Sequence, residues 1–275
     1  MKVTFKEQGH LYESFPAQPW TSVTRVIEKF CPEFNDKDQA VKSSQNSGSK
    51  WYGMKPRKIL EVWEHERERS IDVGHRFHGR MESKAIKLGS KKHRGLVIQV
   101  FPTPFIDGIK TARDQVLLDG VYPEHIIFNE RIGVCGQSDL VFVADGYVDV
   151  SDYKTSKELI FNSYKPTFGK PKTMLAPVDN LEDCNFYHYA LQLSIYLKLI
   201  LMKNTALKPG KLTLIHVTFE LNGQDEYGFP IVKVKNGIEV VKEITHYEVP
   251  YLEKEAVKCL KKMMSLNSMD RVSAF

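Results

Sequence analysis

The chain has 275 residues, of which 42% are hydrophobic and 27% are charged, and its formal net charge at pH 7 is +5. This composition is typical of a globular protein with a large core, and the modest positive charge permits a polyanionic partner. No apolar run reaches the roughly 18 residues of a membrane span, and the first ten residues lack the apolar stretch of a signal peptide. We therefore expect a cytoplasmic protein, of a bacterium or a phage-infected host, with no membrane partner.

The four cysteines are widely scattered and include no C-x-x-C pair; they are Cys31, Cys135, Cys184 and Cys259. Zinc ribbons and iron–sulfur clusters use clustered cysteine ligands, so this spacing argues against both. Reduced and mostly buried thiols are expected.

The N-terminal part of the chain predicts a hairpin followed by helices. The expected elements are a hairpin over residues 2–15 with Gly9 in its turn, a helix capped by Thr21 or Ser22 and ending at Phe30, a mobile polar connection over 35–50, and helices over 57–69, 72–88 and 103–118.

From residue 124 the pattern changes to strands. The expected elements are strands over 124–131, 134–143 and 147–153, a long connection over 157–183, a helix over 185–202, a strand over 212–220, weaker strands over 231–241 and 245–249, and a closing helix over 251–266. The dipeptide Asp145-Gly146 is a strong hairpin signal. This order predicts an α/β fold with a central mixed β-sheet flanked by α-helices.

The most informative residues are Asp152 and Lys154, at the end of the strand over 147–153. Residues two apart on a strand share a face, so both side chains continue the apolar face of Val148 and Val150. An acid and a lysine on a buried face are costly unless they pair with each other, with a metal ion or with a ligand. Taken alone, the D-x-K sequence is better explained by a salt bridge between the two residues at the end of a strand, because this tripeptide is very common.

Asp139 favours the metal-ion interpretation. It lies in the preceding strand, and the turn at Asp145-Gly146 places it on the neighbour of the strand that carries Asp152. Paired strands are about 4.8 Å apart, so both carboxylates can reach one ion. Mg²⁺ takes oxygen ligands and keeps several waters, so two carboxylates suffice, together with substrate phosphate and the Tyr153 carbonyl. Gly136 permits close backbone approach.

Two helices carry further candidates. On the helix over 72–88, His75, His78 and Glu82 share one flank beside an apolar stripe. His78 is either a satisfied histidine or an additional metal ligand, and imidazole also suits Mn²⁺. On the helix over 185–202, Gln192 and Tyr196 are i, i+4 neighbours. They are either amphipathic fillers or contacts that hold the lysine in place.

Together these motifs resemble the PD-(D/E)XK nuclease superfamily, in particular its RecB-like exonuclease branch. The matching motifs are G-H-R-F-H-G-R-M-E with His78 and Glu82, G-Q-S-D with Asp139, D-Y-K-T-S with Asp152 and Lys154, and Q-L-S-I-Y with Gln192 and Tyr196. They occur in the family's order, and the resemblance covers roughly residues 2–201, including an opening similar to phage exonucleases and to the exonuclease of mitochondrial genome maintenance.

The resemblance implies a restriction-endonuclease-like core in a single nuclease domain over 1–275. The expected regions are a hairpin and helical part over 1–120, a catalytic core over 121–203 and a strand and helix extension over 204–275. It also implies metal ligands at His78, Asp139, Asp152 and the Tyr153 carbonyl, a further acid at Glu130, and a Lys154 that orients or deprotonates the attacking water.

The resulting expectation is a Mg²⁺- or Mn²⁺-dependent DNA exonuclease in phage or bacterial replication, recombination or repair, without an iron–sulfur cluster. Thr155 and Ser156 are expected to hold the DNA backbone. Lys154, held near cations in a partly desolvated site, is expected to have a lowered pKa and to act as the base. A structure-specific endonuclease, a catalytically silent DNA-binding subunit, and a metabolic α/β protein with salt-bridged strand ends remain alternatives.

Overall fold

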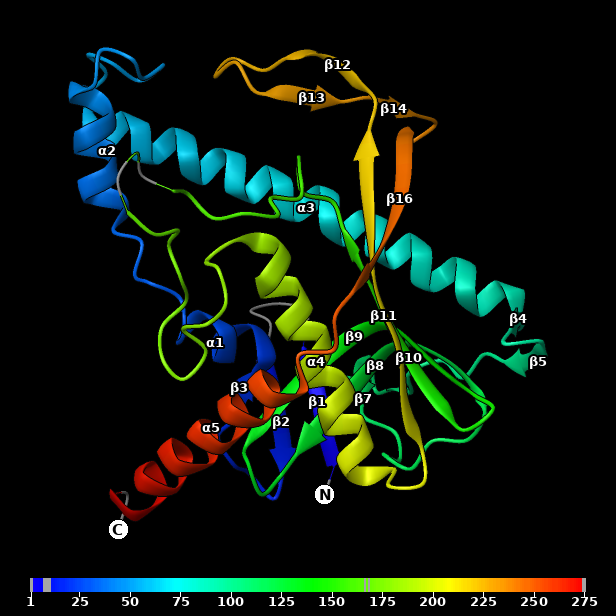
Figure 1. Ribbon diagram of the computed structural model, residues 1–275. Helices are drawn as coiled ribbons and strands as arrows, with labels where there is room; N and C mark the ends of the chain where they lie inside the picture. The colour runs from blue at the N-terminus through cyan, green and yellow to red at the C-terminus, as the bar shows by residue number, and fades with distance from the viewer. Residues whose placement is uncertain (1, 7–10, 166, 168, 274–275) are drawn as a thin grey trace.

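The computed structural model describes residues 2–6, 11–165, 167 and 169–273 of the chain. A six-stranded sheet forms its centre, and helices pack against both faces (Figure 1). The six strands are β3 (Thr21–Ser22), β8 (Gly120–Asn129), β9 (Val134–Ala144), β10 (Tyr147–Lys154), β11 (Lys208–Phe219) and β16 (Val241–Val249). None of the helices in these described residues is both long and apolar enough to cross a membrane.

The sheet is mixed, as the sequence predicts. Its order is β16-β11-β10-β9-β3, and β8 also pairs with β9. The pairs β10–β11 and β3–β9 are parallel, whereas the remaining pairs are antiparallel. The hairpin between β9 and β10 turns at Asp145 and Gly146, both with positive φ, which confirms the predicted two-residue turn. The crossover from β10 to β11 contains the helix α4 (Asn185–Lys203).

One face of the sheet is covered by α1 (Val23–Glu28), α4 and α5 (Glu253–Ser273). Their apolar side chains join those of β8 to β11 in one buried cluster, which includes Val26, Val150, Leu193, Leu214 and Leu260. Segments from the start, the middle and the end of the chain therefore share one core. Ser22 caps α1 by accepting a hydrogen bond from the Arg25 backbone N–H, which confirms the predicted cap.

The other face is crossed by the long helix α3 (Pro56–Leu88). Phe77 of α3 is buried against Val217 and Phe219 of β11. The sequence predicts two helices here, over 57–69 and 72–88, but no Gly or Pro interrupts residues 70–71, and the chain continues as one helix. In Figure 1, β11 and β16 run past α3 towards a set of small hairpins.

The remaining elements lie around this centre. They are β1 (Lys2–Lys6), β2 (Leu11–Phe15), α2 (Asp36–Gln45), β4 (Ser90–His93), β5 (Leu96–Gln99), β6 (Phe105–Ile106), β7 (Ile109–Thr111), β12 (Leu221–Gln224), β13 (Pro230–Val232), β14 (Val234–Lys235) and β15 (Ile238–Glu239). β1 and β2 form the predicted N-terminal hairpin and join β7 and β6 in a small sheet. The turn predicted at Gly9 lies outside the described residues.

Two predictions for the N-terminal part are wrong. Residues 35–50 are not a mobile connection, because they contain α2, capped by the side chain of Asn35, which accepts from the Asp38 backbone N–H at 3.1 Å. Residues 103–118 are not a helix, because Asp107 and Gly108 adopt positive φ and turn the chain between β6 and β7. The connection over 157–183 contains no helix and no strand among its described residues, as predicted, apart from the isolated bridge Thr173–Glu182.

Candidate functional site

The site begins where β9 and β10 separate. Their antiparallel pairing runs from Ala144–Tyr147 to Leu140–Ser151, and the next pair in this register would be Asp139 and Asp152. Beyond the Leu140–Ser151 pair, a side chain replaces the backbone pairing: Asp139 Oδ2 accepts a hydrogen bond from the Tyr153 backbone N–H at 2.6 Å. Directly opposed residues share a face, so both carboxylates lie on one face of the sheet, and the neighbouring strands are the ones that the sequence predicts.

Lys154 lies beside this pair of carboxylates. Its Nζ lies 2.6 Å from Asp152 Oδ2 and donates to Gln192 Oε1 at 3.0 Å. Gln192 Nε2 in turn donates to the Tyr196 hydroxyl at 3.2 Å. The helix α4 therefore holds the lysine through Gln192, which is the positioning role predicted for this residue.

Tyr196 is held against a glycine of β9. A Cβ atom on Gly136 would lie 2.5 Å from Tyr196 Cε1, closer than real contacts allow, so only glycine leaves room for the ring. This is the close approach predicted at Gly136, and the approaching group is a side chain of α4. The packing sets the distance of α4 from the sheet and hence the position of Gln192.

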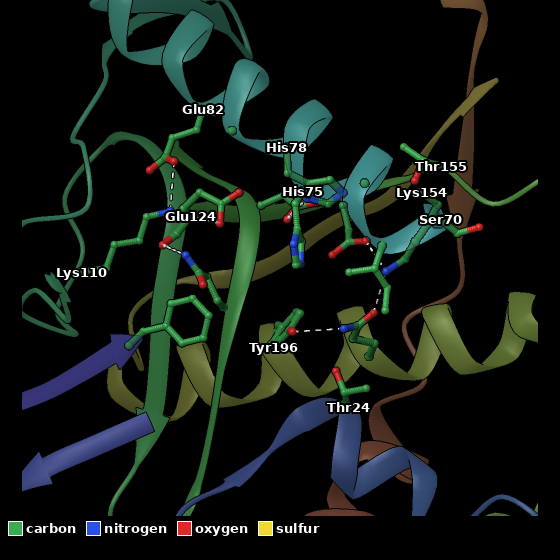
Figure 2. A pocket seen from close by; sticks show the side chains of 18 of the residues that line it. Thr24, Ser70, His75, His78, Glu82, Lys110, Glu124, Lys154, Thr155 and Tyr196 are labelled. Atoms are coloured by element: carbon green, nitrogen blue, oxygen red, sulfur yellow. Dashed lines mark hydrogen bonds and ion pairs between the residues drawn. The ribbon is translucent and has the colours of Figure 1, made fainter. Parts of the chain in front are cut away.

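His78 reaches the site from α3 on the other side. Its Nδ1 lies 3.0 Å from Asp139 Oδ1. Burial disfavours the charged imidazolium, but the Asp139 carboxylate outweighs burial and raises the pKa of His78 to about 9. In Figure 2, His75 and His78 point from α3 into the cavity, and Tyr196 and Thr24 lie on the facing wall.

The further acid of the site is Glu124, and the sequence prediction of Glu130 is wrong in position. Glu130 lies beyond the end of β8, where its partly exposed carboxylate is 3.6 Å from Lys203 Nζ, and it does not line the cavity. Glu124 interrupts β8 with a φ of 51°, between the pairs Pro123–Leu140 and His125–Ser138, and so lies opposite Asp139. Pro123 within the strand was the available signal, since proline marks irregular strand positions.

The other predicted residues divide into two groups. Glu82 and Thr155 line the cavity, and Glu82 accepts a hydrogen bond from Lys110 Nζ at 3.0 Å. Ser156 and Tyr153 do not line it: the Ser156 hydroxyl donates to the Glu158 carbonyl, and the Tyr153 ring packs beside Phe77. Tyr153 contacts the site through its backbone N–H and through its ring, whose centroid lies 6.0 Å from that of His78. The predicted metal contact of the Tyr153 carbonyl stays a prediction.

These groups surround a cavity of about 580 Å³ with a mixed lining of carboxylates, cations and imidazoles. Ligand atoms of His78, Glu124 and Asp139 lie within 4.8 Å of one another. Asp152 Oδ2 is fully buried, and apart from its ion pair with Lys154 it accepts no hydrogen bond from the described residues. Clustered carboxylates of this kind, with one imidazole, fit Mg²⁺ or Mn²⁺.

The carboxylates repel one another in the protein without a cation. Burial and the nearby Asp139 carboxylate raise the pKa of Glu124 to about 8. Burial and the same carboxylate also raise the pKa of Asp152. Both shifts arise first from burial and then from repulsion between carboxylates, and a divalent cation bound among these acids would favour their charged forms.

The lowered pKa expected for Lys154 is not found. Burial lowers the pKa of Lys154, but the carboxylates of Asp152 and Asp139 outweigh burial and raise it. Lys154 is therefore a fixed ammonium group in the protein without a metal ion, and in this state it is a hydrogen-bond donor and not a base.

Comparisons with known proteins assign no family. No family model and no curated protein matches the chain. Among solved structures, one described as "Crystal structure of SSO0001" has 15% sequence identity, covers 90% of this chain and 77% of that chain, and has a TM-score of 0.34. A similarity this weak carries no argument about function, so any proposal rests on the residues of the site.

Proposed function

We propose that the chain is a Mg²⁺- or Mn²⁺-dependent DNA exonuclease on a restriction-endonuclease-like core. One observation carries the proposal: Asp139, Asp152, Lys154 and His78 come from three different elements and meet in one cavity. A simple salt bridge between Asp152 and Lys154 would not require the other two residues or Glu124.

The residues of the chain have distinct tasks in this proposal. His78, Glu124, Asp139 and Asp152 would hold the cation, which when bound neutralises phosphate charge and lowers the pKa of water. Lys154 donates hydrogen bonds from a fixed position to the attacking water or to a phosphate oxygen. Gln192 keeps the ammonium group in place, because its Oε1 accepts a hydrogen bond from one of the three N–H groups of Lys154.

The lining of the cavity also supports a phosphodiester substrate. Arg67, Lys110 and Lys154 line the same cavity as the acids, and Thr155 adds a hydroxyl group. Cations and hydroxyl groups are the usual partners of DNA phosphates. Cleavage would expel the 3′-oxygen and leave a 5′-phosphate.

The test is a digest of end-labelled oligonucleotides, single-stranded and double-stranded, with Mg²⁺ and with Mn²⁺. We expect stepwise shortening by the wild-type chain and none by Lys154→Ala. Glu130→Gln is the matched control, because Glu130 lies outside the cavity, and it should digest DNA at the wild-type rate.

Two outcomes would contradict the proposal. If closed circular DNA is cut as fast as linear DNA, the chain is an endonuclease. If the wild-type chain binds DNA but degrades none with either cation, and Lys154→Ala behaves identically, the chain is a DNA-binding subunit.

A further inference from the structure

A second group of metal-ligating side chains lies apart from the cavity. Cys31 follows α1, Asp183 ends the long connection, and His188 lies in the first turn of α4. Their ligand atoms lie within 4.8 Å of one another, and none of the three lines the cavity. The group is only partly exposed, with 20% and 27% of the Asp183 and His188 side chains accessible.

Both partners of His188 contact the same ring nitrogen. Nε2 lies 3.5 Å from Cys31 Sγ and 2.9 Å from Asp183 Oδ1. A catalytic Cys–His–Asp arrangement uses the two different ring nitrogens, one for the nucleophile and one for the carboxylate. Burial also raises the pKa of the Cys31 thiol to about 11, which makes the sulfur a poor nucleophile at neutral pH. A nucleophilic role is therefore excluded for this group.

A sulfur, a nitrogen and a carboxylate oxygen gathered around one point form a ligand set for Zn²⁺. With usual zinc bond lengths, a tetrahedral site separates sulfur and nitrogen by about 3.5 Å, and nitrogen and oxygen by about 3.4 Å. The first distance is already present. The second distance is 2.9 Å and would have to open by about 0.5 Å when the ion binds.

The backbone around the group is already fixed. The Leu175 N–H donates to the Phe30 carbonyl at 2.7 Å, which ties the long connection to the end of α1. The Asp183 N–H donates to the Lys172 carbonyl at 3.0 Å, and the His188 N–H to the Cys184 carbonyl at 3.1 Å. The three segments are therefore positioned before any ion binds, which lowers the entropic cost of binding.

We infer that Cys31, Asp183 and His188 form a mononuclear Zn²⁺ site with water as the fourth ligand. The ion fastens the connection over 157–183 to α1 and α4. It thereby braces the helix that carries Gln192 and Tyr196. The site uses one thiolate and differs from a four-cysteine iron–sulfur cluster.

Co²⁺ is the probe for the test, because a cobalt–thiolate bond gives a near-ultraviolet charge-transfer band. We expect this band in the wild-type chain and its displacement by Zn²⁺. Cys31→Ser should abolish the band and weaken Zn²⁺ binding by about 100-fold or more, a larger effect than loss of an outer-shell partner. Asp139→Asn and Cys184→Ser are the controls, and both should keep the band.

Alkylation of the wild-type chain gives a second readout that does not depend on any variant. Zn²⁺ should slow iodoacetamide modification of Cys31, as followed by mass spectrometry, and excess chelator should restore the rate. The proposal fails if Co²⁺ gives no thiolate band, if the band persists in Cys31→Ser, or if Zn²⁺ leaves the alkylation rate unchanged. In each of these cases the group is a hydrogen-bonded cluster in which Cys31 Sγ and Asp183 Oδ1 share the Nε2–H of His188.

Discussion

Two aspartates on β10 have opposite surroundings although their positions differ by only three residues. Asp149 accepts hydrogen bonds from Arg94 at 2.6 and 2.8 Å, from His93 at 2.6 Å and from the Lys211 backbone N–H. These donors outweigh burial and lower the pKa of Asp149. Asp152, on the other face of the strand, has Lys154 and a second carboxylate as neighbours, and its pKa is raised.

The difference separates a structural acid from a candidate functional one. The bonds of Asp149 attach the turn between β4 and β5 to the central sheet, and Gly210 leaves room for its carboxylate, because a Cβ there would lie 2.0 Å from Oδ1. The site around Asp152 instead gathers several buried acids, and burial and the Asp139 carboxylate raise the pKa of Asp152. Buried acids with raised pKa values in a cavity mark candidate functional sites.

The largest expected effect is on DNA cleavage. Asp152→Asn should lower kcat by roughly 10² to 10⁴, the usual range for loss of a group that stabilises the transition state. Asp149→Asn should leave kcat within about threefold, because Asp149 faces away from the cavity. Equal losses in single-turnover digests of the two variants would remove the proposed distinction.

The next effect concerns metal affinity and distinguishes the two glutamates of the β8 region. Glu124→Gln should weaken Mn²⁺ binding by about 100-fold or more, as measured by calorimetry, because loss of a ligand exceeds the effect of losing an outer-shell partner. Glu130→Gln should bind Mn²⁺ like the wild type, because Glu130 lies at the far end of β8 beside Lys203. A loss of Mn²⁺ affinity in the Glu130 variant, with none in the Glu124 variant, would instead make Glu130 the metal ligand.

Asp149 should matter most for stability. Asp149→Asn should lower the free energy of unfolding by about 2 kcal/mol, since hydrogen bonds to charged groups are lost. Because the folded pKa of Asp149 is lowered, its contribution is complete above the unfolded pKa of about 3.9 and is lost as the pH falls through the folded value. Urea titrations should therefore show a gap between the two chains at pH 7 that closes below about pH 4.

Metal binding should depend on pH in the neutral range, several units above the range in which an ordinary carboxylate site titrates. The raised pKa values of Glu124, about 8, and His78, about 9, mean that both groups carry protons at neutral pH. Mn²⁺ must displace these protons, so its affinity should rise with pH by about tenfold per unit for each proton released, and level off above about pH 9. A flat profile between pH 6 and 9 would exclude both groups as ligands.

The smallest expected effect concerns the hydrogen bonds from Tyr196 through Gln192 that hold Lys154 in place. Tyr196→Phe removes the hydroxyl that accepts from Gln192 Nε2 but keeps the ring against Gly136. The loss of about 1 kcal/mol corresponds to a fall in kcat of about fivefold, with KM unchanged. An effect as large as that of Asp152→Asn would mean that the Tyr196 hydroxyl itself touches the substrate.

The centre of the fold follows directly from sequence patterns. Alternating hydrophobicity predicts β9 and β10, and Asp145-Gly146 fixes their register, so that Asp139 and Asp152 can be placed opposite each other from the sequence alone. His78, Gln192 and Tyr196 also occupy the expected positions, because helix periodicity places them on faces adjoining the core.

The sequence predictions that the structure contradicts have specific physical causes. Three further turns use the same signal as Asp145-Gly146, with positive φ at both residues: Arg94-Gly95, Asp107-Gly108 and Asn236-Gly237. Reading Asp107-Gly108 as a turn would have replaced the predicted helix over 103–118 with the hairpin of β6 and β7. Glu124 could not be placed in the site by periodicity, because its irregular backbone suspends the alternation of side chains at that residue.

The extension over 204–275 forms ion pairs with α3 that orient this helix. Arg76 and Arg80, one turn apart, both bind the fully buried carboxylate of Glu239 in β15, and His78 lies between them in the sequence. These two ion pairs lie on one side of α3 and therefore fix the rotation of the helix about its own axis. A turn of roughly 20° would move a side chain at a radius of roughly 5 Å by about 2 Å. Misplacements half as large can cost about 10²-fold in rate. The C-terminal hairpins therefore fix the position of the His78 side chain in the site.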